Sequence, residues 1–181
     1  MTLTTPLQAD QPVLTTERMV LRPLQRSDSA LLAMYTGDKR VAEGTRSIPH
    51  PLPPGATEAF IARATSPKRD EDVWVLDGSA KGSAEVLGLI SLKPLDRGQS
   101  QIGYWVAPAF WNAGFASEAL RAVIRANPHG NRTLFAEVFQ DNAASAHVLT
   151  NAGFDYLGEA ETYSVARRAV VPTWTYIRRM D

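Results

Sequence analysis

The sequence predicts one mixed α/β domain, because its two halves carry different patterns of apolar residues. In the first half, short apolar runs at 73–76, 86–92 and 101–106 are separated by turn signals, which predicts an antiparallel meander. In the second half, strand-like runs alternate with amphipathic helical patterns. A length of 181 residues fits a single domain and leaves little room for a second.

The elements can be placed in order along the chain. Residues 1–15 are rich in Thr, Pro and Gln, which predicts a loose leader before a single domain over 16–181. The predicted strands cover 19–24, 73–76, 86–92, 101–106, 132–139, 154–163 and 170–178. The predicted helices cover 29–36, 58–64 and 116–124, and a last helix runs between Asn142 as N-cap and Gly153 as C-cap.

The helix at 116–124 has the clearest periodicity. Ala116, Ala119, Leu120 and Val123 fall at helical spacing, which predicts an amphipathic helix with one buried face. Alternation identifies the strands in the same way, because small and apolar residues occupy every second position along 132–139.

Composition excludes several classes of function. The formal net charge is +0 and the sequence pI is about 6.8, so the basic footprint of a nucleic-acid-binding protein is missing. The absence of cysteine excludes disulfides, thiolate metal sites and a cysteine nucleophile. The histidines, His50, His129 and His147, lack metal-site spacing, so no metal is expected.

The apolar segments are short. None approaches the ~20 residues of a membrane span, so no membrane partner is expected. The N-terminus carries Asp10 and has no apolar run of signal-peptide length, which predicts a cytoplasmic protein.

The most informative segment is 102–120, where a strand ends, a loop containing glycine follows and a helix begins. Such a connection exposes unpaired backbone N–H groups at the positive end of a helix dipole, which suits a phosphate or pyrophosphate. Gly114 and Ala116 keep the backbone open to close approach. The segment lacks Gly-Lys-Ser/Thr and the spaced glycines of a dinucleotide fold. By itself, the pattern is also typical of an ordinary tight connection.

Three blocks of the sequence resemble one known family. A central block, Ile-Gly-Tyr-Trp at 102–105 and Trp-Asn-Ala-Gly-Phe-Ala-Ser-Glu-Ala at 111–119, resembles the central motif of the GNAT acetyltransferase superfamily. It is most similar to the RimJ/RimL-like branch, whose enzymes acetylate the N-terminal amines of ribosomal proteins. The blocks at 16–24 and 142–154 resemble the opening strand and the late helix of the same family, in the same order.

The resemblance implies a fold and an activity. GNAT domains have a mixed, mostly antiparallel, twisted sheet of six to seven strands flanked by helices, which splays between the fourth and fifth strands. A bulge in the fourth strand helps to open a V-shaped cleft for the pantetheine arm of acetyl-CoA. By this resemblance, the chain is an N-acetyltransferase that uses acetyl-CoA as co-substrate and transfers its acetyl group directly to a primary amine.

The resemblance also assigns roles to residues. Backbone groups of 104–106 are expected to bind the pantetheine and the acetyl carbonyl, and N–H groups of 111–116 to bind the pyrophosphate. Asn142 is expected to hydrogen-bond the pantetheine, and Ser145 to lie near the sulfur. The full set of expected cofactor-binding residues is Tyr104, Trp105, Val106, Trp111, Asn112, Ala113, Gly114, Phe115, Ala116, Asn142 and Ser145.

Two residues of the loop depart from the family pattern. Asn112 replaces the usual first glycine, but Asn tolerates a left-handed conformation, so the turn can still form. Ala113 replaces a usual Lys or Arg. The contacts to the CoA phosphates therefore lose one cation, while the backbone donors remain.

Amide formation requires a neutral amine, a polarised thioester carbonyl and release of the thiolate. Without cysteine, direct attack within a ternary complex is the natural path. Glu137, on the strand before Asn142, is the sharpest candidate for the base, although a surface Glu on an alternating strand is the competing interpretation. The alternatives are a water chain and the lower-ranked Glu43, Glu85 and His50.

The general acid is less well defined by the sequence. In one branch of ribosomal-protein acetyltransferases, a Tyr acid follows the base Glu by twelve residues, but here that position is Leu149. Ser145 is the remaining candidate for protonating the thiolate, and a polar residue is equally typical of a first helical turn. The aromatic residues Trp105, Phe110 and Trp111 either line the cleft or pack against the sheet.

The acceptor side is expected to lie between segments 45–55 and 163–170. The acceptor itself remains open between a protein N-terminus and a small-molecule amine. The competing function classes are a non-catalytic CoA-binding regulatory module on the same fold and an RNA- or ribosome-associated binding protein. Both a monomer and a homodimer fit the sequence.

Overall fold

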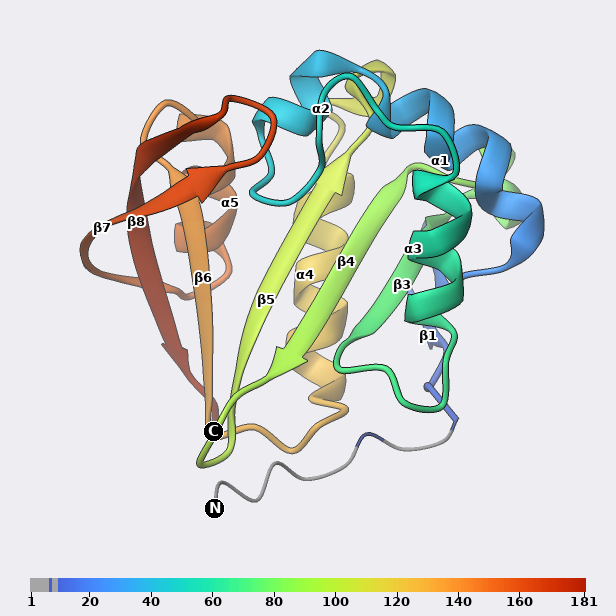
Figure 1. The fold of residues 1–181 in the computed structure, drawn as a ribbon. Coiled ribbons are helices and arrows are strands. Elements are labelled where there is room, and N and C mark those ends of the chain that lie inside the picture. The colour runs from blue at the N-terminus through green and yellow to red at the C-terminus, as the bar shows by residue number, and fades with distance from the viewer. Residues whose placement is uncertain (1–6, 8–9) are drawn as a thin grey trace.

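An eight-stranded sheet forms the centre of the computed structural model, which describes residue 7 and residues 10–181 (Figure 1). Its strands lie in the order β1-β2-β3-β4-β5-β6-β8-β7. They are β1 (Leu14–Thr15), β2 (Val20–Pro23), β3 (Asp72–Asp77), β4 (Gly88–Pro94), β5 (Gln99–Val106), β6 (Thr133–Phe139), β7 (Asp155–Ser164) and β8 (Ala169–Arg179). The helices are α1 (Ser29–Thr36), α2 (Lys39–Glu43), α3 (Ala56–Ala64), α4 (Phe115–Ala126) and α5 (Ala143–Asn151), with 3₁₀ turns η1 (Arg26–Asp28), η2 (Ser79–Lys81) and η3 (Pro108–Phe110).

The sheet opens between β5 and β6, its one parallel pair of neighbours among the described residues. These strands pair only where Gln99–Gln101 faces Thr133–Phe135, and beyond that point they diverge (Figure 1). They are the fourth and fifth strands predicted from the sequence, so the expected position of the splay is confirmed. The expected bulge in the fourth strand is wrong, because β4 and β5 pair from Gly88–Val106 to Pro94–Ser100 without a register shift. The cleft therefore opens because β5 and β6 lose contact.

The prediction of six to seven strands is wrong by one, because β1 adds a short strand paired with β2. It falls within the predicted loose leader, of which residues 1–6 and 8–9 lie outside the described part of the chain. The described residues from Gln11 onward are packed instead. Gln11 Nε2 donates to the Val73 carbonyl at 2.8 Å, and Trp74 Nε1 donates to the Pro12 carbonyl at 2.7 Å. The start of the domain at residue 16 stays a prediction.

Helices cover both faces of the sheet. One core includes Leu120 and Val123 of α4 and Leu149 of α5, packed on side chains such as Trp74. The other core lies on the opposite face and includes residues of α1 and α3. Because both faces are covered, β3 is apolar at successive positions: Val73 and Val75 face one core, Trp74 and Leu76 the other. Figure 1 shows α3 in front of the sheet and α4 behind it.

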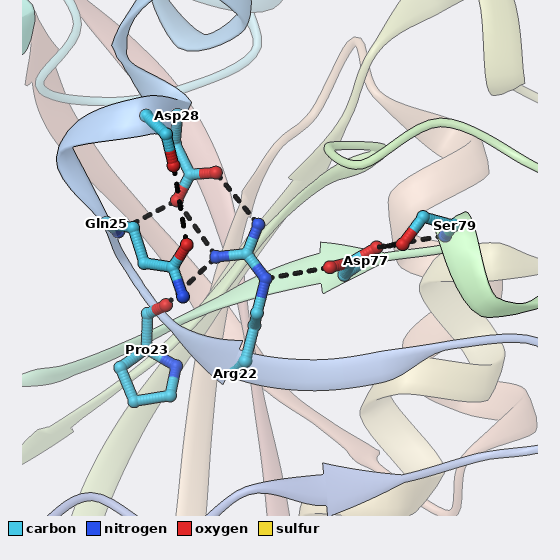
Figure 2. A network of polar contacts seen from close by, with 7 residues as sticks. Arg22, Pro23, Gln25, Asp28, Asp77 and Ser79 are labelled. Atoms are coloured by element: carbon cyan, nitrogen blue, oxygen red, sulfur yellow. Dashed lines mark hydrogen bonds and ion pairs between the residues drawn. The ribbon is translucent and has the colours of Figure 1, made fainter.

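A buried ion-pair network ties α1 to the sheet (Figure 2). Arg22 of β2 donates from Nη2 to Asp28 Oδ1 at 2.8 Å and from Nε to Asp77 Oδ2 of β3 at 2.8 Å. Asp28, only 2% exposed, also accepts from the main-chain N–H of Gln25. The hydrogen bond to Asp28, opposed by burial, raises the pKa of Arg22 further above its usual value. The network therefore fixes the start of α1, whose Leu32 and Thr36 face the cavity described below.

Within residues 7 and 10–181, no helix combines the length and the apolar composition that a membrane crossing requires.

Candidate active site

A cavity of about 1380 Å³ lies where β5 and β6 separate. Residues Gln101–Val106 of β5 form one wall, and Ala136–Phe139 of β6 form the other. The starts of α4 and α5 and the segment from α1 to α3 complete the lining. The described residues contain no group of three or more His, Cys, Asp or Glu side chains that could hold a metal ion.

The edge of β5 facing the gap is available for pairing. Its ladder with β6 ends at Gln101, whereas its ladder with β4 continues to Val106. Tyr104, Trp105 and Val106 all line the cavity. Trp105 packs edge-to-face on Tyr35 of α1 with ring centroids 6.5 Å apart. It therefore lines the cavity and also packs against the core that contains residues of α1 and α3. A strand edge of this kind suits an extended, amide-containing ligand.

The loop between β5 and α4 has the turn that the sequence requires. Asn112 has φ 60° and Gly114 has φ 80°, so the expected left-handed conformation of Asn112 is confirmed. The main-chain N–H groups from 112 to 117 have no protein acceptor in the described part of the chain. They surround the N-terminus of α4, where the helix dipole favours an anion. Of the expected loop residues, Trp111, Asn112, Gly114, Phe115 and Ala116 line the cavity, whereas Ala113 does not.

Trp111 differs from an ordinary core tryptophan. It is 47% exposed, and its Nε1 donates to the Val106 carbonyl at 2.7 Å, which ties the loop to the end of β5. Phe110 packs against the first core and lines the cavity. Both aromatic residues therefore contribute to the cleft.

Two arginines lie beside the loop, where Ala113 supplies no cation. The Arg18 guanidinium stands 4.2 Å from the Phe115 ring centroid, and its Nε donates to Glu118 Oε1 at 2.8 Å. Burial alone would raise the pKa of Glu118, but hydrogen bonds from Thr16 and Arg18 outweigh it and lower that pKa. Arg40 of α2 lies 5.8 Å from the Trp111 ring centroid. Arg40 is ion-paired with Asp38, as Arg18 is with Glu118, so the two residues place guanidinium groups beside the loop without adding net charge.

Asn142, Ser145 and Tyr104 meet at the start of α5. The Asn142 side-chain oxygen accepts from the Ser145 main-chain N–H at 3.2 Å, so the predicted N-cap is confirmed. The Tyr104 hydroxyl donates to the Ser145 carbonyl at 3.0 Å and accepts from Ser145 Oγ at 3.1 Å. Burial raises the pKa of Tyr104 to about 12, although the bond from Ser145 opposes the shift. This phenol therefore stays protonated at neutral pH.

The structure places Glu137 on the β6 wall of the cavity, where its Oε1 is buried without a hydrogen-bond partner. Leu149 is fully buried in the core, away from the cavity lining. Among the lower-ranked candidates, Glu43 lines the cavity, but Glu85 and His50 do not, so these two are not brought to the site. Glu85 lies on the exposed loop that follows η2.

The two segments expected to flank the acceptor side meet, and residues of both line the cavity. The Val165 N–H donates to the Arg46 carbonyl at 3.0 Å, and Arg167 Nη2 donates to the Glu43 carbonyl at 2.8 Å. Arg167 also pairs with Asp141, and this hydrogen bond, opposed by burial, lowers the pKa of that carboxyl. The turn between β7 and β8 is therefore fastened to the end of α2 and bridges the open sheet.

Sequence reasoning missed Arg18, Arg40, Arg167 and Thr173, which surround or line the site. Each residue is brought to the site by a contact with a residue far away along the chain or by the pairing of two strands. Arg18 meets Glu118 across 100 residues, and Arg167 meets Glu43 across 124. The only local signal was Arg18 in the opening block at 16–24, which indicated a strand.

Comparisons with known proteins agree with this geometry. Residues 18–155 match the family model of the acetyltransferase (GNAT) domain. The chain is 28% identical over 161 residues to the uncharacterized N-acetyltransferase YoaA of Bacillus subtilis (strain 168), covering 84% of this chain and 88% of YoaA. The fold is similar to that of RimL, a ribosomal L7/L12 alpha-N-protein acetyltransferase solved with coenzyme A. For RimL the TM-score is 0.80 at 17% identity, covering 94% of this chain and 99% of RimL.

The fold is also similar to that of MccE, a microcin C7 self immunity acetyltransferase solved with acetyl-CoA and AMP. The TM-score is 0.78 at 13% identity, covering 99% of each chain. These two identities are low, so the solved structures support the fold. The family match spans most of the chain, from just before β2 to the start of β7. The chain therefore belongs to the GNAT acetyltransferase family and is an acetyl-CoA-dependent N-acetyltransferase, with acetyl-CoA as its co-substrate.

Proposed function

We propose that the enzyme transfers acetyl directly from acetyl-CoA to a primary amine within a ternary complex. The observation that carries this proposal is the arrangement of one continuous cavity. It joins the free edge of β5 and the N–H-rich loop before α4 to a carboxylate, Glu137, and a hydroxyl, Ser145, from two further elements. The acceptor is either a protein N-terminus or a small-molecule amine.

Each part of acetyl-CoA has a matching surface. The pyrophosphate binds the free N–H groups at 112–117, with the guanidinium groups of Arg18 and Arg40 nearby. The Trp111 N–H, which was expected to take part, already donates to the Pro108 carbonyl at 3.2 Å. The pantetheine pairs with the backbone of 104–106 on the open strand edge. Asn142 contributes its side-chain nitrogen, because its oxygen is already occupied by the Ser145 N–H. Ala113 contributes its backbone alone.

The reaction then needs one base and one acid. Glu137 accepts a proton from the acceptor ammonium, and the neutral amine nitrogen attacks the thioester carbonyl carbon. The new C–N bond forms as the C–S bond breaks, and the thiolate leaves. The CoA thiolate takes up a proton from Ser145 Oγ, which Tyr104 holds by a hydrogen bond. The second amine proton, lost as the amide forms, passes through solvent water to Ser145 Oγ and restores its hydroxyl.

Tyr104→Phe tests this last step. Removing the hydroxyl deletes the partner of Ser145 Oγ. We expect kcat to fall about tenfold, less than the hundredfold or more of a lost general acid, because Tyr104 acts through Ser145. The KM for acetyl-CoA stays within about twofold, because the proposed pantetheine contacts are backbone groups. The loss is constant between pH 7 and 9, since the pKa of Tyr104 is about 12. Steady-state kinetics measures both constants, and Tyr156→Phe, on an exposed tyrosine of β7 outside the cavity lining, is the control. An unchanged kcat in Tyr104→Phe contradicts the assignment.

Two finer features belong to the same proposal. The Ile-Gly-Tyr-Trp motif at 102–105 supports placement in the RimJ/RimL-like branch, which favours an N-terminal amine as acceptor. A cytoplasmic location is part of the same proposal. Neither feature by itself selects the acceptor, because one fold serves many acceptors.

A thiol-release assay tests the proposed function. Acetyl-CoA is combined with N-terminal peptides, amino acids, polyamines or aminoglycosides, alongside calorimetric titration of acetyl-CoA. Binding with turnover on one acceptor class supports the proposal and names the substrate class. Binding without turnover on any of these amines favours a non-catalytic CoA-binding module instead.

A further inference from the structure

Two buried oxygens on the β6–β8 wall have no partner. Glu137 Oε1 and Thr173 Oγ1 are both buried, and neither makes a hydrogen bond in the described part of the chain. Thr173 is 0% exposed, yet both residues line the cavity. Most buried polar side-chain atoms have a hydrogen-bond partner. Two buried oxygens without one, on the same wall of the cavity, therefore suggest that a ligand supplies the missing donors.

Strand register places the two side chains on the same face. In the antiparallel pair β6–β8, Glu137 faces Thr175, and Phe139 faces Thr173. Opposite residues and residues two apart share a face, so Glu137 and Thr173 are diagonal neighbours, with Cα atoms roughly 7–8 Å apart. No hydrogen bond joins them, so a small donor group between them could bond to both.

The register between β5 and β6 places Glu137 beside the strand edge that is proposed to bind the acetyl group. β5 and β6 last pair at Gln101 and Phe135, and two residues farther along each strand come Gly103 and Glu137. Glu137 therefore stands across the gap from Gly103, directly before the 104–106 edge proposed to bind the pantetheine. Gly103 carries no side chain to fill this space, and a Cβ there would approach only Ser91 Oγ, at 3.5 Å.

We propose that Glu137 and Thr173 together seat the protonated primary amine of the acceptor. An ammonium group has three N–H donors and no acceptor. It can therefore donate to both Glu137 Oε1 and Thr173 Oγ1, which accept no hydrogen bond from the described residues. The Arg167 guanidinium lies 4.7 Å from the Phe139 ring centroid, but it forms an ion pair with Asp141. The carboxylate of Glu137 has no such ion pair among the described residues, so its charge is available to the acceptor.

Thr173 is a positioning residue in this proposal, which rests on the proposed function. Its backbone is fixed, because Gln140 Nε2 donates to the Thr173 carbonyl at 3.2 Å. The hydroxyl therefore holds the amine at a set place beside Glu137, while Glu137 takes its proton. The acceptor class that fits is an unhindered primary ammonium. A neutral alcohol of equal size fits less well, because it brings no charge and only one donor for the two oxygens.

The test uses n-butylamine and n-butanol as probes on the CoA-loaded protein, with binding followed by ligand-observed NMR at pH 7. Wild type and Thr173→Ser bind n-butylamine, and n-butanol binds at least about tenfold more weakly, because it lacks the charge and the additional donors. Thr173→Val binds n-butylamine about tenfold more weakly, as expected for the loss of one hydrogen bond to a charged group. Glu137→Gln loses at least as much affinity.

Stability separates this role from a structural one. Thr173→Val removes a buried hydroxyl that has no hydrogen-bond partner among residues 7 and 10–181, and it keeps the side-chain shape. Its free energy of unfolding should therefore equal or exceed that of wild type, while its KM for the amine rises and its calorimetric affinity for acetyl-CoA is unchanged. A side chain needed only for folding would show the opposite pattern.

Three outcomes overturn the inference: Thr173→Val binds n-butylamine as wild type does, n-butanol binds as tightly as n-butylamine, or wild type binds neither probe. Failure of the proposed function gives a different result, in which n-butylamine binds as described but no amine in the thiol-release panel is acetylated.

Discussion

Glu137→Gln should lower kcat by about a hundredfold or more, the scale of a lost general base. Gln keeps the shape of the side chain but has no proton affinity, so the acceptor ammonium is not converted to the neutral amine. The KM for acetyl-CoA changes little, because the proposed cofactor contacts lie on β5, α4 and α5. Steady-state kinetics with the acceptor found in the thiol-release assay measures both constants.

The matched control is Glu161→Gln on β7, an exposed glutamate outside the cavity lining, which should keep wild-type kinetics. If Glu137→Gln keeps its kcat within about threefold of wild type, a water chain rather than Glu137 removes the proton from the acceptor ammonium.

Gly88→Ala is expected to cause the largest loss of stability. Gly88 of β4 pairs with Val106 of β5, and a Cβ there would lie 2.1 Å from the Trp105 carbonyl oxygen and 2.9 Å from the Val106 Cα. Both are backbone atoms, so no side chain can move aside. We expect the free energy of unfolding to fall by about 3 kcal/mol or more, as for severe overpacking. Urea denaturation measures this change.

Gly103→Ala is the matched control in the neighbouring strand, since its Cβ would meet only Ser91 Oγ at 3.5 Å. It should unfold within about 1 kcal/mol of wild type. Equal stability of the two variants would show that β4 and β5 do not approach as closely at the cleft as described.

Local sequence patterns predict most of the fold, because helices and strands are visible in short-range periodicity. The helix predicted at 29–36 coincides with α1, and the helix at 116–124 lies within α4. The misses are short. β1 has two residues and α2 has five, too few for a periodic signal to develop.

Part of the candidate site can likewise be predicted from local sequence, and part depends on tertiary contacts. The loop with Asn112 and Gly114 could be predicted, because a left-handed turn before a helix leaves local marks in the sequence. Thr173 could not, because its place beside Glu137 depends on the register between β6 and β8. The nearby cations, Arg18 and Arg40, likewise come to the loop only through tertiary contacts.

The most direct test of the account is an amide NMR titration of the protein with acetyl-CoA. The N–H groups at 112–117, which have no acceptor among the described residues, are proposed to bind the CoA pyrophosphate. We therefore expect saturable binding, with the largest chemical-shift changes in the amides of 112–117 and of 104–106. Saturation that leaves the 112–117 signals unmoved, or the absence of binding, would contradict it.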